Sequence, residues 1–378
     1  MELVVWILNG PMNAGGTESL IMELLRNKDS QVDVKLIIHS ANNQNAGVYD
    51  EEIQKLGIPV YYLPSVGSVG INHYEKAFRA LVEEIGKPNI IHSNMNAVGG
   101  LICKVAKKCG IPSRIVHCHA DIKYRGSALS RLKSELGLYI MKKYVNKYAN
   151  YYWACSEAAA RRLFYKDKKY IVIPNMIHVQ KYFHDNEKRE QQRAKLNIHE
   201  NTIAVGAVGR VAPIKNYEVI IDAISILKQR GVNAQFYCYG NIVNETYFNS
   251  LRKRIEERSI SDRVHFLGNS MEISANLNAF DIYVMPSTTE GLGISALEAQ
   301  AAGLPTLLST GVPKETDMGL GLVQRVETND PNSWAEKIIN SQAVSLDKEL
   351  ILQAFQKKGY DSKTKCKEIY QMYINMVE

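Results

Sequence analysis

Residues 281–305 read DIYVMPSTTEGLGISALEAQAAGLP, one complete strand–turn–helix pattern. The apolar run at 281–287 predicts a buried strand, and two glycines behind it allow a tight turn. Residues 294–302 predict a helix that ends at Gly303, because glycine accommodates the left-handed conformation that follows many helices. A strand that passes directly into a helix in this way is typical of parallel α/β sheets.

Two carboxylates lie in this stretch. Glu290 precedes the helix, beside its free backbone N–H groups, and Glu298 lies more than one turn inside it. This spacing separates the carboxylates too far for a close acid–base dyad. They are better placed to hold different parts of one elongated ligand.

The alternation of short apolar runs and helical patterns extends through most of the chain. It predicts two tandem, doubly wound, Rossmann-like α/β domains that would face each other across a cleft. We expect the first over 1–182, the second over 183–360 and a terminal helix over 361–378. The polar stretch 184–201 contains no strand pattern and is a candidate link between domains. The expected strands include 3–8, 33–39, 60–63, 89–93, 114–119, 151–156, 170–175 and 203–211.

Length and composition agree with this organisation. The chain has 378 residues, 46% of them hydrophobic, which suits two domains that each bury a core. No run of about 18 apolar residues predicts a membrane span, and the first residues lack the pattern of a secretory signal. Six scattered cysteines form no Cys-x-x-Cys pair, so we expect a reduced, cytoplasmic protein.

Metal and nucleic-acid binding are both disfavoured. The triplet HCH at 117–119 could suggest a metal site, but neighbours on a strand point to opposite faces and no second ligand cluster accompanies it. The net charge of +7 is concentrated in 122–148, where seven basic side chains face one acid. That segment carries no aromatic platform or recognised nucleic-acid-binding motif.

The motif NGPMNAGGTES at 9–19 follows the first expected strand. Gly15 and Gly16 would let the backbone approach a ligand, and Thr17 would cap the next helix, whose free N–H groups favour an anion. An ordinary strand–helix turn is the alternative. A nicotinamide site is disfavoured, because the G-x-G-x-x-G spacing and the acidic residue that would hold a ribose are absent.

Two further motifs follow expected strands. VHCHAD at 116–121 would place His119 at the carboxyl end of its strand, with a purely structural histidine as the alternative. GRVAPIKN at 209–216 holds Arg210 and Lys215 on one loop, and two cations with backbone donors nearby suit a diphosphate. Solvated surface charges are the alternative for this pair. Ligands of open α/β sheets bind beyond the carboxyl ends of the strands, where all these motifs lie.

Together these motifs resemble those of the retaining glycosyltransferases of family 4, which have the GT-B fold. The resemblance covers essentially the whole chain. It implies that the first domain is the acceptor side and that the terminal helix crosses back to it. Asn216 and Met176 stand where members often have glycine, and Ala120 stands where they often have a polar or small residue. The motifs are GGTE (15–18), HCH (117–119), IPN (173–175), GRVAPIK (209–215) and EGLGISALEAQAAGLP (290–305).

The family implies where the nucleotide of the donor would lie. Gly16 would approach its diphosphate from the first domain, and Arg210 and Lys215 would bind that group from the second and stabilise it as it leaves. Glu298 would accept hydrogen bonds from the ribose hydroxyls. No Asp-x-Asp sequence occurs, so the cations would act in place of a divalent metal and no cofactor is expected.

The family also implies contacts to the donor sugar. Glu290 would hold its hydroxyls, and His119 would hold a hydroxyl close to the reacting centre. The amides of Gly291, Leu292 and Gly293 would lie near the sugar and the phosphate. The expected reaction moves a hexose or N-acetylhexosamine from a UDP-sugar to a saccharide, with retention at the anomeric carbon.

The basic segment 122–148 bears on the acceptor. A helix here could lie on an anionic membrane, which would make the protein peripheral on the inner face. The acceptor would then be a lipid-linked saccharide of a cell-envelope or exopolysaccharide pathway. The alternative is a helix with a buried apolar stripe and a solvated basic face. The apolar residues at roughly helical spacing are Leu129, Leu132, Leu136, Tyr139, Ile140 and Tyr144.

Two other functions fit some of these motifs. One is an enzyme that hydrolyses or epimerises sugar nucleotides, and the other is a catalytically silent partner subunit that binds them. The paired glutamates together with GRVAPIK favour a transferase. The complete set of Arg210, Lys215, Glu290 and Glu298 argues against a silent subunit.

Overall fold

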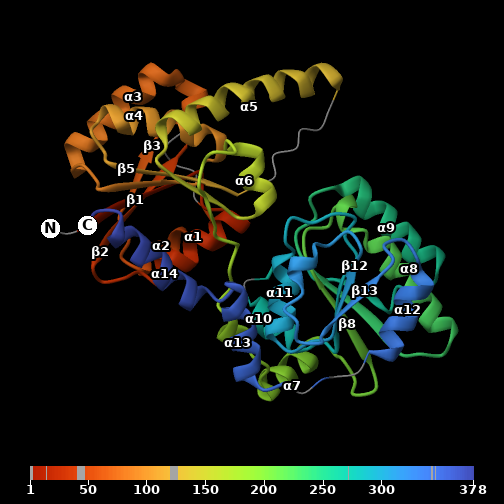
Figure 1. The fold of residues 1–378 in the computed structure, drawn as a ribbon. Helices are drawn as coiled ribbons and strands as arrows, with labels where there is room; N and C mark the ends of the chain where they lie inside the picture. Colours follow the sequence, from red (N-terminus) through yellow and green to blue (C-terminus); the bar gives the residue numbers. More distant parts are fainter. Residues whose placement is uncertain are drawn as a thin grey trace. The chain divides into compact units, whose positions relative to one another are not determined.

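The computed structural model describes residues 3–13, 15–40, 47–119, 127–270, 272–341, 344 and 346–378, and it contains two compact units (Figure 1). Unit 1 comprises Met1–Met176 together with Ser362–Glu378, and unit 2 comprises Ile177–Asp361. The boundary therefore falls after residue 176 rather than after residue 182. The reason is that Val179 and Tyr182 pack into an apolar core of unit 2.

Unit 1 is built on a seven-stranded parallel sheet with the order β3-β2-β1-β4-β5-β6-β7. Its strands are largely buried runs of β-branched and other apolar residues, as in sheets that helices cover on both faces. All the strands predicted for this half are present. They are β1 (Leu3–Asn9), β2 (Val32–His39), β3 (Val60–Leu63), β4 (Ile90–Ser93), β5 (Ser113–Cys118), β6 (Tyr151–Ala154) and β7 (Ile171–Val172).

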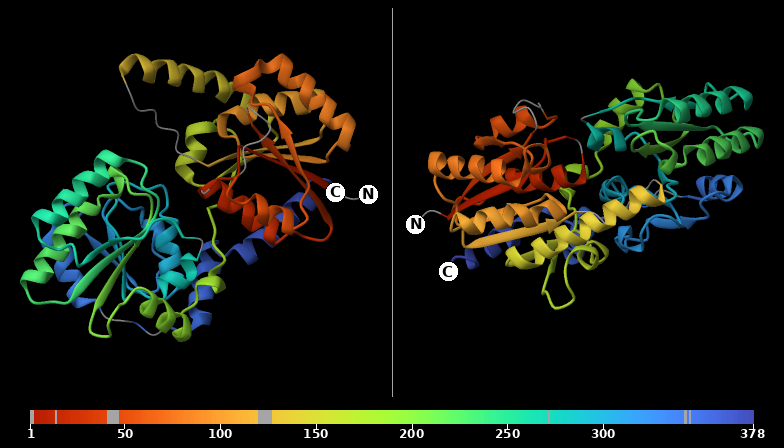
Figure 2. Two further views of the ribbon diagram at one scale, coloured as in Figure 1. Left: turned by 180° about the vertical axis from the view of Figure 1, so that it is seen from behind. Right: turned by 90° about the horizontal axis from the view of Figure 1, so that it is seen from above.

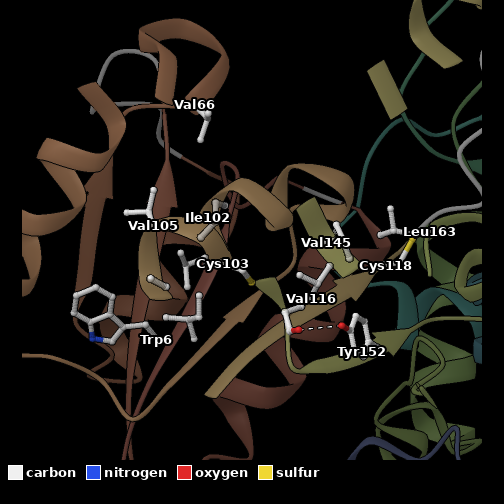
Figure 3. Packing of buried hydrophobic residues seen from close by; sticks show 14 of the residues in the cluster. Trp6, Val66, Ile102, Cys103, Val105, Val116, Cys118, Val145, Tyr152 and Leu163 are labelled. Atoms are coloured by element: carbon white, nitrogen blue, oxygen red, sulfur yellow. Dashed lines mark hydrogen bonds between the residues drawn. The ribbon is translucent and has the colours of Figure 1, made fainter. Parts of the chain in front are cut away.

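Helices cover both faces of this sheet. One layer contains α3, α4, α5 and α6, and the other contains α1, α2 and α14 (Figure 1). Figure 3 shows part of the first layer's core, to which Trp6, Ile102 and Val145 belong. The helices are α1 (Gly16–Arg26), α2 (Asp50–Lys55), α3 (Val66–Ile85), α4 (Gly99–Lys108), α5 (Ala128–Tyr148), α6 (Glu157–Leu163) and α14 (Ser362–Asn375), with the 3₁₀ turn η1 (Asn96–Val98).

The terminal helix α14 belongs to unit 1 although it is formed by the last residues of the chain. Its apolar stripe packs beside α1. The Tyr370 hydroxyl donates to the Leu24 carbonyl at 2.8 Å, and the Cys366 thiol donates to the Glu23 carbonyl at 3.4 Å. The terminal helix thus packs against the first half of the chain, as the family resemblance implies.

Unit 2 has a six-stranded parallel sheet with the order β10-β9-β8-β11-β12-β13. Figure 2 shows the ribbon of each unit from two further sides. One face carries α8, α9 and α12, and the other carries η2, α10, α11 and α13. Both units are therefore doubly wound, which confirms the predicted α/β class. The strands are β8 (Ile203–Val208), β9 (Ala234–Tyr239), β10 (Val264–Phe266), β11 (Ile282–Met285), β12 (Thr306–Ser309) and β13 (Val323–Val326).

The helices of unit 2 are mostly short. They are α7 (Asn186–Lys195), α8 (Tyr217–Gln229), α9 (Glu245–Glu257), α10 (Ile273–Leu277), α11 (Ile294–Ala301), α12 (Pro331–Asn340) and α13 (Lys348–Lys358), with the 3₁₀ turns η2 (Val179–Tyr182), η3 (Pro213–Lys215) and η4 (Lys314–Thr316).

The polar stretch 184–201 is not a link between the units, so that prediction was wrong. It forms α7, which is fixed to unit 2 by two arginines. Arg189 donates to the carbonyls of Asn278 and Phe280 at 3.0 and 2.9 Å, and Arg189 and Arg193 both pair with Asp281. Ion pairs to a residue far along the chain hold α7 in place, whereas other helices of unit 2 are held by their buried apolar faces.

Helix α5 occupies most of the basic segment 122–148. Lys123 and Arg125 lie outside the described residues, as do the side chains of Leu129 and Arg131. The helix buries Leu138 and Val145, whereas Leu132, Leu136, Tyr139 and Ile140 are exposed. The alternative of a buried stripe was therefore wrong for these four residues. In the described part of the chain, no helix is both long enough and apolar enough to span a bilayer.

Candidate active site

The carboxyl ends of β8 and β11 bring a lysine into contact with a glutamate. Lys215 ends η3 in the loop after β8, and Glu290 follows β11. Lys215 Nζ lies 2.7 Å from Glu290 Oε1, and the Ser287 hydroxyl donates to the same oxygen at 2.6 Å. The Lys215 and Glu290 side chains are each only 15% exposed. An ammonium and a carboxylate held at this edge of the sheet can bind phosphate and hydroxyl groups of one ligand.

The turn between Glu290 and α11 depends on a close backbone approach. Gly293 has a φ of 79°, and a Cβ added there would lie 2.9 Å from Met285 Sδ. The Thr316 hydroxyl donates to the Leu292 carbonyl, which fixes the middle of the turn. Gly291 is exposed, and a Cβ added there would meet nothing within 4 Å. Contacts with Met285 and Thr316 thus fix the turn at Gly293 and Leu292, whereas Gly291 is exposed.

Glu298 lies on α11 and has a partner of its own. The Tyr182 hydroxyl, from η2, donates to Glu298 Oε1 at 2.7 Å. Burial raises the pKa of the Glu298 carboxyl, and the hydrogen bond from Tyr182 and the charge of Lys181 oppose that rise. Glu290 and Glu298 therefore have separate environments, as their spacing in the sequence indicates.

Asn216 ties the Lys215 loop to the Glu290 loop. Its backbone is left-handed, with φ 54° and ψ 42°. Its amide donates to the carbonyls of Pro286 at 3.2 Å and Thr328 at 2.9 Å. Pro286 directly follows β11 in the segment that leads to Glu290, so one buried side chain connects the Lys215 loop to the Glu290 loop.

Arg210 is not part of this contact. It follows β8, and its side chain is exposed. Within the described ranges no carboxylate lies at ion-pair distance from it, in contrast to Lys215. The structure thus places Lys215, but not Arg210, against Glu290. In the described part of the chain, the Arg210 guanidinium has no carboxylate partner that would compete with a bound anion.

In unit 1, His119 lies directly after β5. Its Nε2 lies 2.7 Å from Asn94 Oδ1, and its backbone amide donates to Asn96 Oδ1 at 2.7 Å. An amide oxygen only accepts, so Nε2 carries the proton and Nδ1 is left as an acceptor. Among the described residues Nδ1 has no hydrogen-bond partner. Burial lowers the pKa of His119 to about 3, so the ring is neutral at pH 7.

The neighbouring histidines have a structural role. His92 Nδ1 lies 2.6 Å from the Tyr373 hydroxyl, and His92 Nε2 lies 3.1 Å from His117 Nδ1. Burial lowers the pKa of both rings, to about 3 for His92. No group of three or more His, Cys, Asp or Glu side chains that could hold a metal occurs in the described part of the chain.

The start of α1 differs from the prediction. The helix begins at Gly16 and its N-cap is Gly15, so the predicted capping by Thr17 was wrong. Glu18 folds back over this end, accepts from the Asn9 amide at 3.2 Å and would collide with a Cβ on Gly15. A Cβ on Gly15 would meet only the end of the flexible Glu18 side chain, which can move aside. The backbone at Gly16 remains at the helix N-terminus, where anions are favoured.

Two family descriptions match the chain. "Glycosyl transferase 4-like domain" matches residues 15–176, and "Glycosyl transferases group 1" matches residues 188–341. The matches lie on either side of the unit boundary at residue 176. The chain is a glycosyltransferase of family 4.

Known relatives resemble this glycosyltransferase over much of its length. EpsF of Bacillus subtilis (strain 168), whose name classes it as a glycosyltransferase, is 29% identical over 377 residues, which are 98% of this chain and 96% of EpsF. The UDP-Gal:alpha-D-GlcNAc-diphosphoundecaprenol alpha-1,3-galactosyltransferase of Escherichia coli is 24% identical over 77% of this chain and 76% of its own.

Solved structures share the architecture of the glycosyltransferase. Anabaena Alr3699/HepE, crystallised in complex with UDP and glucose, has a TM-score of 0.78 over 99% of this chain and 100% of that one, at 18% identity. A likeness at this identity shows the fold, and it confirms the predicted GT-B class.

This chain departs from the family pattern at three positions, and the structure describes two of them. Asn216 occupies a left-handed position that glycine or asparagine adopts at low cost. Met176 is buried at the end of the first part of unit 1. Ala120 lies outside the described residues.

Three polar contacts of the glycosyltransferase were missed in the sequence. Asn94 and Ser287 each come just after a strand, the position at which α/β sheets carry their ligand-binding residues, so that rule could have found them. Tyr182 lies in a segment with no distinctive local pattern, and its partner Glu298 is 116 residues away.

Proposed function

We propose that this glycosyltransferase moves a hexose or N-acetylhexosamine from a UDP-sugar to a saccharide acceptor, with retention and without a divalent metal. The observation that carries the proposal is the contact between Lys215 and Glu290, supported by Ser287. It offers a cation to the diphosphate and a carboxylate to the sugar hydroxyls of one donor.

Charge stabilisation is the main chemical role that we assign to unit 2. As the bond from the anomeric carbon to the diphosphate breaks, negative charge grows on the phosphate and positive charge on the sugar ring. Lys215, Arg210 and the backbone amides at the start of α11 would stabilise the phosphate charge before reaction begins. The departing phosphate could accept the proton of the acceptor hydroxyl on the same face, which gives retention.

Glu290 would bind the sugar hydroxyls and hold the sugar in position while positive charge develops on its ring. Its carboxylate already accepts from Ser287 and Lys215, so its position is fixed before the donor arrives. The amides of Gly291, Leu292 and Gly293 would lie along the sugar and phosphate. The openness at Gly291 supports this placement.

The nucleotide is assigned as uridine diphosphate through the relatives. The Escherichia coli relative is named for UDP-Gal, and Anabaena Alr3699/HepE was crystallised with UDP and glucose. Glu298 would bind the ribose hydroxyls, for which a carboxylate acceptor is suited.

Unit 1 would contribute His119 and Gly16. The unused acceptor at His119 Nδ1 suits a sugar hydroxyl, because a hydroxyl can donate to it without any change of protonation. The backbone at the start of α1 suits a phosphate oxygen.

A donor panel without metal tests the proposal. Thermal unfolding and UDP release are measured in EDTA with UDP-glucose, UDP-galactose and their N-acetylated forms. One of these should raise the melting temperature and be consumed slowly, since a ligand of the folded state stabilises it. Lys215→Met should lose most of the shift. A strict requirement for added metal, or no response to any UDP-sugar, would contradict the proposal.

The exposed surface of α5 supports the proposal that the acceptor is bound to a membrane. Leu132 and Leu136 are 66% and 60% exposed, and Tyr139 and Ile140 continue the same stripe. Exposed apolar residues beside Lys133, Lys143 and Lys147 suit an anionic membrane surface. We therefore propose a lipid-linked saccharide acceptor.

Envelope or exopolysaccharide synthesis at the inner face of the membrane is the pathway that this acceptor implies. The six cysteines are free thiols, which agrees with a reducing compartment. The protein would then be cytoplasmic and peripheral on the membrane.

A further inference from the structure

We propose that Tyr182 is a positioning residue that sets the Glu298 carboxylate for the ribose of the donor, so that preference for a ribonucleotide over a 2′-deoxyribonucleotide depends on the Tyr182 hydroxyl. The inference rests on the proposed ribose-binding role of Glu298 and extends it to a residue in a different segment of unit 2.

The geometry of the pair is specific. Tyr182 is 8% exposed, and its ring belongs to the apolar cluster that includes Leu297 of α11 and Phe355 of α13. From this buried position its hydroxyl reaches Glu298 Oε1 at 2.7 Å. The ring is thus anchored in the core while its hydroxyl meets the half-buried Glu298 carboxylate.

The helix that carries Glu298 is already fixed by other contacts. Gln300 donates to the Thr316 carbonyl at 2.8 Å and accepts from the Met318 amide at 2.9 Å. At the other end, the Ser295 hydroxyl donates to the Val208 carbonyl at 2.9 Å. The remaining freedom of Glu298 is therefore in its own side-chain torsions, and the bond from Tyr182 restricts these.

A restricted carboxylate recognises hydroxyls better than a free one. An unrestrained glutamate loses rotamer entropy when a ligand fixes it, and that loss weakens binding. Tyr182 fixes the side chain before the ligand arrives and occupies one acceptor site on Oε1. The other oxygen and the remaining lone pair stay available for the ribose hydroxyls.

The hydrogen bond also favours the charged form of Glu298. Burial raises the pKa of this carboxyl, and the Tyr182 hydroxyl opposes the rise because it donates to the ionised oxygen. An ionised carboxylate accepts from two hydroxyls, whereas a protonated one must donate at one oxygen. Removal of the Tyr182 hydroxyl should therefore weaken recognition through both orientation and charge.

A purely structural Tyr182 is the competing explanation. A buried tyrosine commonly donates to whichever acceptor is nearest, and its loss would then loosen unit 2 in general. General loosening weakens all ligands of the site alike. The ratio of affinities for two nucleotides that differ only in one ribose hydroxyl separates the two explanations.

The experiment measures the affinities of UDP and 2′-deoxy-UDP by calorimetry on the full chain. Four forms are compared: wild type, Tyr182→Phe, Glu298→Gln and Tyr247→Phe. The last is a matched control, because Tyr247 also donates to a glutamate, Glu218, within unit 2. A melting curve for each form establishes that it is folded, and Tyr182→Leu is a second variant without the hydroxyl.

We expect wild type to bind UDP at least tenfold more tightly than 2′-deoxy-UDP, and Glu298→Gln to lose most of that ratio. Tyr182→Phe should lower the ratio to less than half of the wild-type value, and Tyr247→Phe should preserve it. Equal weakening of both nucleotides by Tyr182→Phe, with the ratio retained, overturns the inference alone. Absence of any preference in wild type overturns the role of Glu298, and the inference falls with it.

Discussion

At the scale of the residue, Asn216 adopts a left-handed backbone conformation that favours glycine, and its side chain also makes hydrogen bonds. Its left-handed backbone is a conformation that glycine adopts without strain. The amide also binds the Pro286 and Thr328 carbonyls, which no glycine could do. Asn216 therefore holds the Lys215 and Glu290 loops together at a position where most residues would be strained.

Replacement of Asn216 separates these two contributions. Asn216→Ala should destabilise unit 2 by about 2–4 kcal/mol, because it loses buried hydrogen bonds and replaces asparagine, which tolerates the left-handed region, by alanine, which is strained there. Asn216→Gly should cost about 1 kcal/mol less, since it loses only the hydrogen bonds. Hydrogen exchange resolved by peptide in unit 2, at increasing urea concentration, measures both costs. Equal costs for the two variants would show that backbone strain plays no part.

At the scale of the element, α5 has two faces with different partners. Leu138 and Val145 pack into the core of unit 1, and the exposed stripe of Leu132, Leu136 and Tyr139 has no cover within the described structure. A surface of this kind beside lysines is typical of interfacial helices. Burial of one leucine contributes about 1.5–3 kcal/mol, so single changes should be measurable.

Vesicle flotation tests this use of α5. Wild type should float with vesicles that contain phosphatidylglycerol at low salt and should be released by high salt, because the charge attraction is screened. Leu136→Ser should weaken binding about tenfold. Leu350→Ser is the control, since Leu350 is 56% exposed on α13 of the other unit. Wild type that stays unbound at low salt contradicts the membrane proposal.

The elements also show which parts of the structure the sequence could predict. Buried strands such as β1 and β11 carry their signal locally, in apolar runs that end at glycine or proline, and they were predicted. Helix α7 was not, because Asp281, which anchors it, lies far along the chain. Tyr182 was missed for the same reason, whereas Lys215 and Glu290 were found because each follows a strand. Local patterns thus indicate candidate residues after strands, and long-range partners decide how their side chains are held.

At the scale of the whole molecule, buried histidines are unevenly divided. Unit 1 contains four whose pKa is lowered by burial: His39 to about 4, His92 and His119 to about 3, and His117 also. In unit 2 the described residues show one such histidine, His265. Unit 2 also holds Glu298. Because its pKa is raised in the folded state, a fall in pH through this range stabilises the folded state at this residue, whereas it destabilises the folded state at the histidines.

This division predicts a difference in acid stability. A histidine that stays neutral in the folded state contributes stability above pH 6.5, and this is lost as the pH falls below 6.5 and the unfolded chain takes up protons. Each such group weakens unit 1 by up to about 1.4 kcal/mol per pH unit. Hydrogen exchange resolved by peptide, at pH 7 and pH 5, should show unit 1 losing more protection, after correction for intrinsic rates. Equal losses in the two units would contradict this reasoning.

We propose that Glu290 acts on the donor sugar while Lys215 holds the diphosphate. The most direct measurement is the rate of UDP release by Glu290→Gln beside its affinity for UDP. We predict a fall in turnover of about 100-fold or more, because a fixed charge next to the reacting sugar is lost. UDP affinity should be unchanged or tighter, since Lys215 no longer has an internal carboxylate partner. A variant that turns over normally, or one that loses UDP binding in parallel with turnover, would contradict the account.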